Sequence, residues 1–507
     1  MSKKIIVIGA GAAGLASAIR LQYAGYQVEL YEKESTPGGK MNQIEMEGYR
    51  FDLGPTIVMM PSMYREIFEY CGRNPDDYVP MEQLDPMYRV YFSKDTSRPM
   101  DVSNDLVQWT RTLESISNED AAGFLDYLGD LYRGFNVAWD SILQRPFRKP
   151  SDFYNLSMLK KGMKMKAGRN ANQFIGKYIK DERIKQMLSF QTLYIGISPT
   201  QSPSFYTMIP AIQFTHGVWF MKGGMHTMAT SMEKLFKELG GTIHYQAEVE
   251  EILIKDKKAI GIRVNQKQIL SDYVVCNADF PYAMKNLVQD KEAKGKYTDK
   301  KIDQMKYSCS CFVMYLGMDR KYDEWEHVHN FVFSDQFEEN MNDIFEGNKI
   351  KKGSFYVYIA SKLDPTLAPE GKDGIYIMMP VSNISSSKYK WNDETIADYR
   401  TYILDTLKTI EGFENLENEI VAEKHFTPVD FEETFHAYNG ATFGLLPSLN
   451  QSGPMRPQSK SKTSSNLYFT GSSTHPGAGV PIVLLSAKIA AQELIQDDQG
   501  IIFDYDH

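Results

Sequence analysis

A glycine-rich turn near the start of the chain constrains its fold more than any other feature of the sequence. Residues 5–8 form an unbroken β-branched run, which is typical of a strand buried on both faces of a parallel sheet. Gly9, Gly11 and Gly14 follow with the spacing G-x-G-x-x-G and lead into a helix of small residues that is expected to end near Gly25. The first glycine permits a tight turn, the second lets a pyrophosphate approach the backbone, and the third lets the helix pack closely on the strand. The pattern predicts a dinucleotide-binding βα unit.

An acidic residue follows at the position that such a unit requires. A second apolar strand, residues 28–31, ends in Glu32, eighteen positions after Gly14. A carboxylate there can accept hydrogen bonds from both hydroxyls of an adenosine ribose. The phosphates would lie on the N–H groups of the helix N-terminus, around Ala12 and Ala13. This context favours a dinucleotide site over a plain βα turn.

A second glycine turn favours FAD over NAD. Gly38-Gly39-Lys40 comes just after the acidic strand, and the segment Phe51-Asp52-Leu53-Gly54-Pro55-Thr56 comes next. Paired glycines with a cation suit a second approach to the same pyrophosphate, for which a nicotinamide dehydrogenase has no use. The apolar residues 57–61 that follow either pack in the core or line an apolar passage that reaches the flavin ring.

Size and composition set broad limits on the class of protein. With 507 residues the chain is too long for one ordinary core, so two or three domains are expected. A hydrophobic content of 42% and a charged content of 24% are typical of a globular protein. The net charge of −9 argues against a nucleic-acid binder, which needs a basic field.

The cysteines and the N-terminus indicate a cytosolic protein. The four cysteines include no C-x-x-C pair, and such sparse usage fits a reducing compartment. Cys309 and Cys311 would share one face of a strand, where packing is expected rather than a metal site. Lys3 and Lys4 precede an apolar stretch, but the glycine spacing explains these residues better than a signal peptide does. Since no run of eighteen apolar residues occurs, no membrane span is predicted.

A basic segment followed by an uncharged one stands out from this acidic chain. Residues 160–185 contain nine basic and two acidic residues, a local balance of +7, whereas residues 186–221 contain no Lys, Arg, Asp or Glu. The uncharged stretch is apolar and aromatic but is interrupted by glycine and proline, so it cannot be one spanning helix. The pattern fits either a peripheral membrane surface, with lysines on anionic headgroups, or a solvated basic helix followed by ordinary core.

The middle of the chain alternates between strand-like and helical segments. Residues 64–145 are expected to begin a substrate domain, and residues 222–280 to return to the nucleotide fold. The predicted elements are a helix from Met225 to about Leu239, a hairpin of residues 242–254 and 259–264, strands at 273–276, 312–317, 355–359 and 374–380, and a helix at 393–410.

The C-terminal segment is again rich in signals. Residues 467–471 predict a strand and a glycine turn, and residues 472–479 predict a loop before a helix that opens at Val480-Pro481. A helix N-terminus directed at an isoalloxazine ring can stabilise negative charge on the reduced ring. The alternative is that the glycines simply cap a C-terminal helix.

Three blocks carry a family resemblance: the N-terminal glycine turn, GGKMNQIEMEGYRFDLGPTIVMMP and LYFTGSSTHPGAGVPIVLLSAK. Together with FTPVDFEETFHAYNGATFGLLPSLNQS, PFRKPSDFYN and FQTLYIGISP, they resemble the bacterial phytoene-desaturase family of FAD enzymes over the whole chain. The resemblance implies FAD as the sole redox cofactor and desaturation of a linear thirty-carbon polyene, 4,4'-diapophytoene, toward 4,4'-diaponeurosporene in a staphyloxanthin-like pathway. It also implies a cytoplasmic enzyme bound peripherally to the inner face of the cell membrane.

The resemblance leaves some roles open. The family often has Arg after the paired glycines, and Lys40 keeps the charge but loses the bidentate fork. Desaturation sends a hydride to flavin N5 and a proton to a base or water. The candidates for the base are His475, Glu433, Glu432 and His436, and each also has a structural interpretation. A carotenoid terminal-methyl oxidase, a polyene isomerase and a non-catalytic flavin- or lipid-binding membrane protein are the alternatives.

The predicted architecture is an α/β protein with a Rossmann-type FAD-binding domain built from discontinuous segments, residues 1–86, 215–290 and 425–507. A sheet-based substrate domain takes residues 87–145 and 291–424, and residues 146–214 form a helical membrane-associating part. The expected partners are the hydrophobic polyene and an anionic membrane, and homo-oligomerisation is left open. The residues expected to contact the flavin are Gly9, Gly11, Ala12, Ala13, Gly14, Glu32, Lys33, Gly39, Lys40, Gly54, Pro55, Thr56, Val249, Gly471, Gly479, Val480 and Pro481, and no metal ligand is expected.

Overall fold

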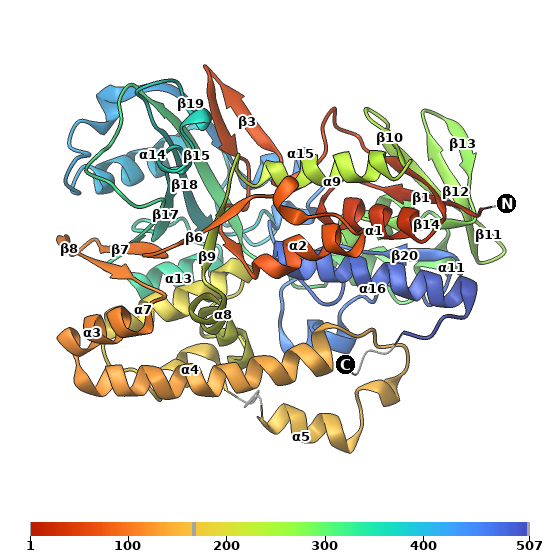
Figure 1. Ribbon diagram of the computed structural model, residues 1–507, viewed down its shortest axis with the longest axis horizontal. Helices are drawn as coiled ribbons and strands as arrows, with labels where there is room; N and C mark the ends of the chain where they lie inside the picture. The colour runs from red at the N-terminus through yellow and green to blue at the C-terminus, as the bar shows by residue number, and fades with distance from the viewer. Residues whose placement is uncertain (1, 165–168, 504–507) are drawn as a thin grey trace.

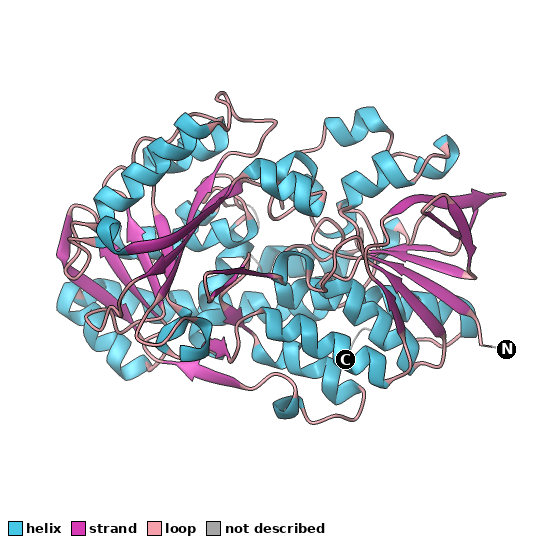
Figure 2. Ribbon diagram, turned by 90° about the horizontal axis from the view of Figure 1, so that it is seen from above, coloured by secondary structure: helices cyan, strands magenta, loops and turns pink. Residues whose placement is uncertain are grey.

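Two β-sheets lie toward opposite ends of the molecule, with helices packed around and between them (Figure 1). The computed structural model describes residues 2–164 and 169–503. Seen from above, the strands of the first sheet fan out near the N-terminus and the second sheet lies at the other end (Figure 2). The protein is therefore a mixed α/β molecule in which a site can form between the sheets.

The first sheet is parallel and has the earliest predicted strand at its centre. Residues 5–8 are almost fully buried, because their alternate side chains enter two different cores. Ile5 and Val7 face one core, and Ile6 and Ile8 face the other, which confirms a strand covered on both faces. In spatial order the strands are β10 (Thr242–His244), β2 (Gln27–Tyr31), β1 (Lys4–Ile8), β14 (Tyr273–Cys276) and β20 (Leu467–Phe469).

Helices cover one face of this sheet and a small antiparallel sheet covers the other. Helix α1 packs against α9 and α16, and α16 also contacts α2 (Figure 1). The bounds of these helices are α1 (Ala12–Tyr23), α2 (Pro61–Tyr70), α9 (His226–Glu238) and α16 (Val480–Gln499). On the other face lie β11 (Val249–Lys255), β12 (Lys258–Val264) and β13 (Lys267–Leu270), with the short helices α10 (Phe280–Tyr282), α11 (Lys291–Lys294) and α12 (Asp299–Asp303).

One strand prediction was wrong. Residues 242–254 do not form one arm of a hairpin, since β10 belongs to the parallel sheet and β11 to the antiparallel one. The chain turns between them at Gln246, whose φ is +51°, a left-handed conformation that ends a strand. The N–H groups of Gln246 and Ala247 donate to the carbonyls of Glu34 and Glu32, so the segment is tied across the end of β2 instead. The hairpin itself is β11–β12, and β13 extends it.

The second sheet has seven strands and is antiparallel except where β7 meets β16. Strand β15, which pairs with β19 on one side and β18 on the other, is buried at all nine residues, so both of its faces are covered. In spatial order the strands are β19 (Ile420–Phe426), β15 (Ser310–Met318), β18 (Gly374–Val381), β17 (Phe355–Tyr358), β16 (His329–Phe333), β7 (Tyr88–Phe92) and β8 (Asp95–Val102). Helices α13 (Phe337–Glu346), α14 (Asp393–Leu407) and α15 (Pro428–Phe435) pack beside it.

Two small sheets connect the large ones, and a group of helices lies below them in Figure 1. The connecting strands are β3 (Gln43–Met46), β4 (Tyr49–Asp52), β5 (Val58–Met59), β6 (Met81–Leu84) and β9 (Val218–Met221). The helices are α3 (Leu106–Ile116), α4 (Asn118–Ala138), α5 (Leu156–Lys164), α6 (Ala171–Ile175), α7 (Glu182–Phe190) and α8 (Met208–His216). Among residues 2–164 and 169–503, no helix is both long and apolar enough to cross a bilayer. Lys166 of the predicted basic segment lies outside the described residues.

Two glycines of α4 give a matched test of how this helix packs. A Cβ added at Gly123 would lie 2.0 Å from the carbonyl oxygen of Tyr178, whereas one added at Gly134 would meet nothing within 4 Å. We expect Gly123→Ala to lower the free energy of unfolding by about 2 kcal/mol or more, since backbone would have to move. Gly134→Ala should raise it by about 0.5–1 kcal/mol, because alanine favours a helix. Thermal unfolding followed by circular dichroism measures both, and equal effects would contradict this packing.

Candidate functional site

One long cavity runs between the two large sheets and carries a glycine-lined end and an aromatic end. The first end is formed by the turn after β1, the end of β2 and the start of α16. The second end is formed by β15, β16, β17 and β18 of the seven-stranded sheet and by residues 190–194. The cavity could therefore hold a polar ligand at its glycine-lined end and an apolar molecule at its aromatic end, in one continuous space.

The glycine turn after β1 forms a cradle at the start of α1. Gly11 has no side chain with which to cap this helix, and the next two residues line the cavity and leave their N–H groups for a ligand. Asn277 accepts a hydrogen bond from the N–H of Gly14 at 3.0 Å and donates one to the carbonyl of Thr470 at 3.2 Å. A Cβ at Gly14 would lie 1.9 Å from the carbonyl oxygen of Gly9, and one at Gly11 would lie 2.9 Å from Oδ1 of Asn277. Only glycine fits this approach.

Glu32 lies at the end of β2, where the parallel sheet opens. Its side chain is 7% exposed, and its two carboxylate oxygens accept hydrogen bonds from the N–H groups of Ala10 at 2.6 Å and Glu34 at 2.9 Å. Burial raises the pKa of this carboxyl, and the two backbone hydrogen bonds oppose the shift. Each oxygen keeps a free lone pair, so the carboxylate can still accept ribose hydroxyls.

The paired glycines bring a buried cation across the cavity. Gly38 and Gly39 have φ of +123° and +55°, which turns the chain back over Gly11. Lys40 then extends its ammonium to the carbonyl oxygen of Thr442 at 2.7 Å. Burial lowers the pKa of Lys40, since the ammonium is far from water. The Nζ atom of Lys40 thus links the paired-glycine turn to the C-terminal part of the chain.

The loop before α16 closes the glycine-lined end. Gly479 has φ of +101° and precedes a helix start with no side-chain cap, and Val480 and Pro481 line the cavity. Arg456 supports this loop, since it donates to the carbonyls of Thr474 and Ser472 as well as to those of Gln451 and Leu445. Burial lowers the pKa of Arg456 to about 10. Nothing in the sequence pattern around this arginine pointed to such a role.

The predicted flavin contacts lie together in the structure. All of them line the cavity except Gly14, which packs on Gly9 instead. They come from seven separate stretches of sequence, which supply Gly9 with Gly11–Ala13, Glu32–Lys33, Gly39–Lys40, Gly54–Thr56, Val249, Gly471 and Gly479–Pro481.

Of the four candidate bases, His436 alone lines the cavity. His475 is buried, its Nε2 is 3.1 Å from the carbonyl oxygens of Ile142 and Arg145, and burial lowers its pKa to about 4. Glu433 is exposed, and neither residue lines the cavity. His436 does line it, with its ring stacked on Tyr282 and its Nε2 3.0 Å from Glu248.

The aromatic end was visible in the sequence only in part. Ile57 and Met59 line the cavity, whereas Val58 and Met60 are buried in cores. The apolar stretch therefore both packs in the core and lines an apolar space. Cys311 also forms part of the cavity wall. The remaining apolar wall comes from Phe190, Leu193, Tyr194, Phe331, Tyr356, Tyr376, Met378 and Phe443, which no local motif distinguishes from ordinary core residues.

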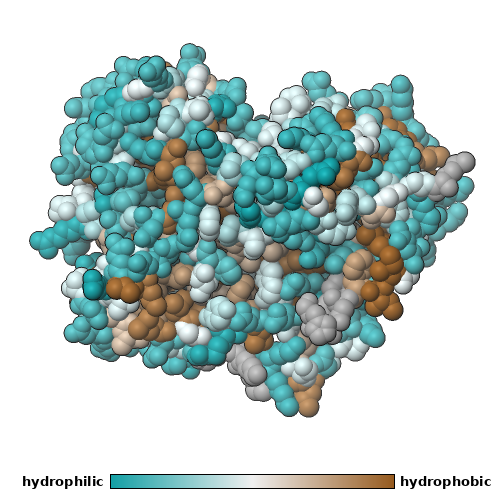
Figure 3. Space-filling model, in the orientation of Figure 1, coloured by the Kyte–Doolittle hydropathy of each residue, from teal (hydrophilic) through white to brown (hydrophobic). Residues whose placement is uncertain are grey.

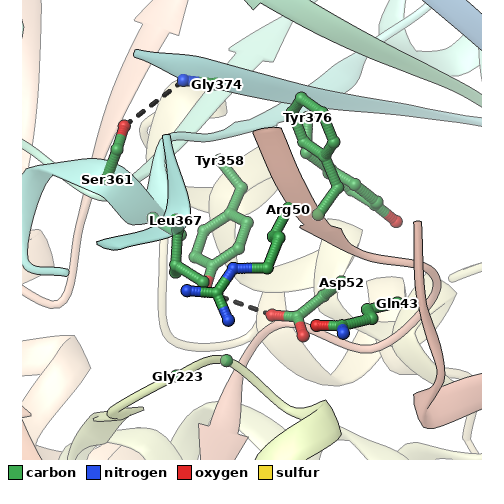
Figure 4. Close-up of a pocket in the computed structure, with 12 residues that line it drawn as sticks. Gln43, Arg50, Asp52, Gly223, Tyr358, Ser361, Leu367, Gly374 and Tyr376 are labelled. Carbon is green, nitrogen blue, oxygen red and sulfur yellow. Dashed lines mark hydrogen bonds between the residues drawn. The ribbon is translucent and has the colours of Figure 1, made fainter. Parts of the chain in front are cut away.

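A small polar pocket lies behind the aromatic end, with room for about one water (Figure 4). Asp52 projects into it and accepts hydrogen bonds from the N–H groups of Met225 at 2.7 Å and His226 at 3.3 Å. The hydroxyl of Tyr358 is 3.4 Å from the other carboxylate oxygen. Burial raises the pKa of Asp52 to about 7. Tyr376 borders both this pocket and the main cavity.

Comparison with known proteins assigns the class. Residues 12–495 match the flavin-containing amine oxidoreductase family, and the chain belongs to this family. It is an FAD-dependent oxidoreductase, as the two glycine segments predict.

Two relatives within this family match almost the whole chain. The chain is 45% identical over 503 residues to the 4,4'-diapophytoene desaturase (4,4'-diaponeurosporene-forming) of Staphylococcus aureus strain bovine RF122, which covers 98% of this chain and 100% of the relative. It is 46% identical over the same length to the protein of that name in strain MSSA476. These relatives confirm the resemblance to the phytoene-desaturase family that the sequence blocks carry.

Solved structures share the fold. An oxidoreductase from Methanosarcina mazei has a TM-score of 0.65 at 19% identity, covering 96% of this chain and 100% of its own. A putrescine oxidase variant has a TM-score of 0.61 at 12% identity, covering 98% and 99%. A fatty acid isomerase from P. acnes has a TM-score of 0.56 at 13% identity, covering 98% of both chains. At these identities the likeness describes the architecture alone.

Valine at position 11 tests the glycine cradle. We expect Gly11→Val to reduce flavin retention by more than about tenfold, equivalent to ~1.4 kcal/mol, because its side chain would fill the space above the start of α1. The backbone tolerates the change, since φ is −69° at this residue. Flavin absorbance per protein after gel filtration is the measurement. Gly134→Val in α4 is the control, and full flavin content in Gly11→Val would contradict the assignment.

Proposed function

We propose that the protein desaturates 4,4'-diapophytoene toward 4,4'-diaponeurosporene, with transfer of a hydride to FAD and loss of a proton. The observation that carries this proposal is the continuity of the cavity, which joins a glycine cradle for a dinucleotide to an aromatic chamber for a hydrocarbon. The name of the Staphylococcus aureus relatives supports the choice of substrate, because they match this chain over almost its whole length.

The residues of the glycine-lined end suit FAD. The uncapped start of α1 offers N–H groups to the pyrophosphate, and Glu32 offers carboxylate oxygens to the ribose. The turn at Gly39 and the loop at Gly54 continue the cavity toward the aromatic end, where the flavin ring would lie. The uncapped start of α16, at Gly479, would face the ring. FAD supplies the two-electron acceptor when bound.

In this proposal the FAD-binding domain is of the Rossmann type and takes residues 1–86, 215–290 and 425–507. The five strands of the parallel sheet support it, since all of them come from these segments. The substrate domain takes residues 87–145 and 291–424. The strands of the seven-stranded sheet come from these two segments, except that β19 crosses the boundary at residue 424.

The aromatic end suits a substrate without polar groups. A linear polyene can be held only by shape and by burial of its carbon chain, at roughly 0.8 kcal/mol per buried CH₂. Phe190, Leu193, Phe331 and Met378 provide such a wall, and Tyr194 and Tyr356 present their rings to the same space. A wall of this composition would hold a hydrocarbon beside the flavin ring by shape and burial, without hydrogen bonds to the substrate.

Expression in cells that make only 4,4'-diapophytoene tests the function. We expect pigments that absorb at longer wavelength than the substrate, because each desaturation lengthens the conjugated chain. Mass spectrometry should show the loss of hydrogen in pairs and no added oxygen. The Gly11→Val variant serves as the control without flavin. An oxygenated product would instead indicate a terminal-methyl oxidase, and a product of unchanged mass would indicate an isomerase.

The enzyme also docks on an anionic membrane in this proposal, through α5 and the residues before it. Tyr154, Leu156 and Leu159 are 64%, 68% and 61% exposed, and Lys160 beside them is exposed too. Apolar side chains appear at the lower edge of the surface in Figure 3, where α5 projects in Figure 1. Apolar side chains that enter the interface and lysines that meet anionic headgroups act together.

In this proposal the uncharged stretch that follows the basic segment forms the route from the membrane to the cavity. Phe190, Leu193 and Tyr194 belong to residues 186–221 and line the aromatic end. A substrate dissolved in the bilayer would therefore meet apolar protein on its way to the flavin. The net charge of −9 does not prevent docking, because charges beyond a Debye length of about 8 Å are screened at physiological salt.

Charge reversal on α5 tests the docking surface. We expect Lys160→Glu/Lys161→Glu to weaken binding to acidic liposomes by about 2 kcal/mol or more, since each lysine near the surface contributes about 1 kcal/mol. Co-sedimentation at physiological salt is the measurement, and flavin content should not change. Lys255→Glu/Lys258→Glu, on the β11–β12 hairpin, carries the same change in charge and should still bind. Full binding by the α5 variant would move the docking surface elsewhere.

A further inference from the structure

The wall of the aromatic end contains a chain of buried polar groups that a hydrocarbon does not need for binding. The hydroxyls of Thr56 and Tyr356 are 2.8 Å apart, and both residues line the cavity. The hydroxyl of Tyr356 is also 2.6 Å from Nδ1 of His329. Burying such groups costs free energy even when they are hydrogen-bonded to one another, so their presence beside an apolar chamber needs a reason.

His329 ends this chain inside the protein. It is 1% exposed, and within the described residues its Nε2 has no hydrogen-bond partner. Its ring stacks on Tyr358, with centroids 5.2 Å apart and planes at 12°, and on Tyr356 at 5.9 Å and 24°. The histidine lies on β16 and both tyrosines on the adjacent β17, so the pairing of two strands fixes the geometry of the three rings.

The other end of the chain lies where the two halves of the cavity meet. Thr56 directly follows Gly54 and Pro55, which line the same cavity. The carbonyl of Gly54 accepts a hydrogen bond from the hydroxyl of Tyr376 at 3.0 Å, and the carbonyl of Leu53 accepts one from Tyr315 at 2.6 Å. These bonds hold the segment against the seven-stranded sheet. The hydroxyls of Thr56 and Tyr356 thus lie where the glycine-lined end of the cavity passes into the aromatic end.

We propose that Thr56, Tyr356 and His329 form a relay that accepts the proton released by the polyene, an inference that rests on the proposed function. One C–H bond of the substrate breaks and its electron pair leaves as the hydride that FAD takes up. The adjacent C–H bond then breaks, and its electron pair becomes the second bond of the new C=C. The proton passes to the oxygen of Tyr356, whose own proton moves to Nδ1 of His329.

Each residue has a separate task in this relay. Since Tyr356 gives its own proton to His329 in this relay, the hydroxyl of Thr56, 2.8 Å away, is the donor to the oxygen of Tyr356. Tyr356 receives the substrate proton and remains a neutral phenol, because it gives up its own. His329 holds the resulting positive charge on its ring until the proton returns through the same hydroxyls to water that enters after the product leaves. Only the histidine changes its charge.

The surroundings keep the relay in the required state. Burial lowers the pKa of His329 to about 3, so the imidazole is neutral and its Nδ1 lone pair is available. Burial raises the pKa of Tyr356, so the phenol keeps its proton. A C–H bond next to an allylic cation is far more acidic than an imidazolium ion, and a weak base therefore suffices. Tyr358 and Tyr376 are neutral for the same reason as Tyr356, and Asp52 is the carboxyl behind them (Figure 4).

The histidine that lines the cavity itself is less well placed. His436 stacks on Tyr282 and contacts Glu248, on the side of the cavity where Lys33 and Glu34 contribute to its pKa. That is the side of Glu32 and therefore of the ribose, away from the junction at Thr56. At this junction the hydroxyls of Thr56 and Tyr356 are followed by a base, Nδ1 of His329.

Anaerobic bleaching of the bound flavin by 4,4'-diapophytoene in liposomes tests the relay in a single turnover, with rates taken per bound flavin. We expect Tyr356→Phe and His329→Phe to slow bleaching at least about tenfold, since removal of a general base costs more than that in most enzymes. Tyr358→Phe removes the neighbouring hydroxyl on the same strand and should stay within about twofold of the wild type. Equal rates for Tyr356→Phe and the wild type would overturn the relay and leave the desaturase assignment intact.

Two further readouts separate proton transfer from a structural role. The wild-type rate should fall in D₂O, because the proton between Tyr356 and His329 exchanges with solvent, and Tyr356→Phe should lose this dependence. In the ¹⁵N-histidine NMR spectrum, the signal of His329 Nδ1 should shift in Tyr356→Phe even without substrate. An unchanged signal would overturn the hydrogen bond on which the relay depends. If the wild-type flavin were not bleached at all, the proposed function itself would fail.

Discussion

The seam between the two large sheets is held by hydrogen bonds to one segment, residues 51–56, and the site depends on it. Tyr315 and Tyr376 of the seven-stranded sheet donate to the backbone of this segment, and Asp52 within it accepts from the start of α9, which packs on the parallel sheet. Lys40 adds a link from the paired-glycine turn to Thr442. Two of these bonds are buried and two are partly buried, so a lost partner in the buried pair would leave an unsatisfied polar group at a cost of roughly 1–3 kcal/mol. The two halves of the cavity are therefore kept in register.

Burial in and around the site also decides which side chains carry charge. It lowers the pKa values of His329 and His475 and raises those of the tyrosines around the aromatic end, so all of these groups are neutral near physiological pH. Arg456 stays charged, and hydrogen bonds to backbone carbonyls rather than a carboxylate stabilise its positive charge. An apolar chamber beside a flavin can hold neutral polar groups at a modest cost, whereas an unpaired charge would be far more expensive.

The sequence predicted the elements best where local pattern and tertiary environment agree. β1 was expected from its β-branched run, and β15, β17 and β18 agree with their predicted ranges within two residues, since strands covered on both faces are continuously apolar. The prediction for residues 242–254 failed because a left-handed turn at Gln246 is tied to the end of β2, a partner more than 200 residues earlier. The hydrophobic periodicity of a short stretch of sequence does not report a contact with a residue so far away in the chain.

What the sequence determined by itself is the glycine-lined end of the cavity and the membership of a flavoprotein family. Glycine spacing, an acid after the second strand and a helix start at Val480 are local requirements of nucleotide binding, and each is encoded within a few residues. Only the tertiary structure decided which groups share the aromatic end. It placed His475 against backbone carbonyls outside the cavity, and it brought Thr56, Tyr356 and His329 together from three segments. The physical reason is that phosphate binding uses backbone geometry, which short motifs specify, whereas a proton relay or a hydrocarbon wall needs side chains that only strand pairing between distant segments brings into contact.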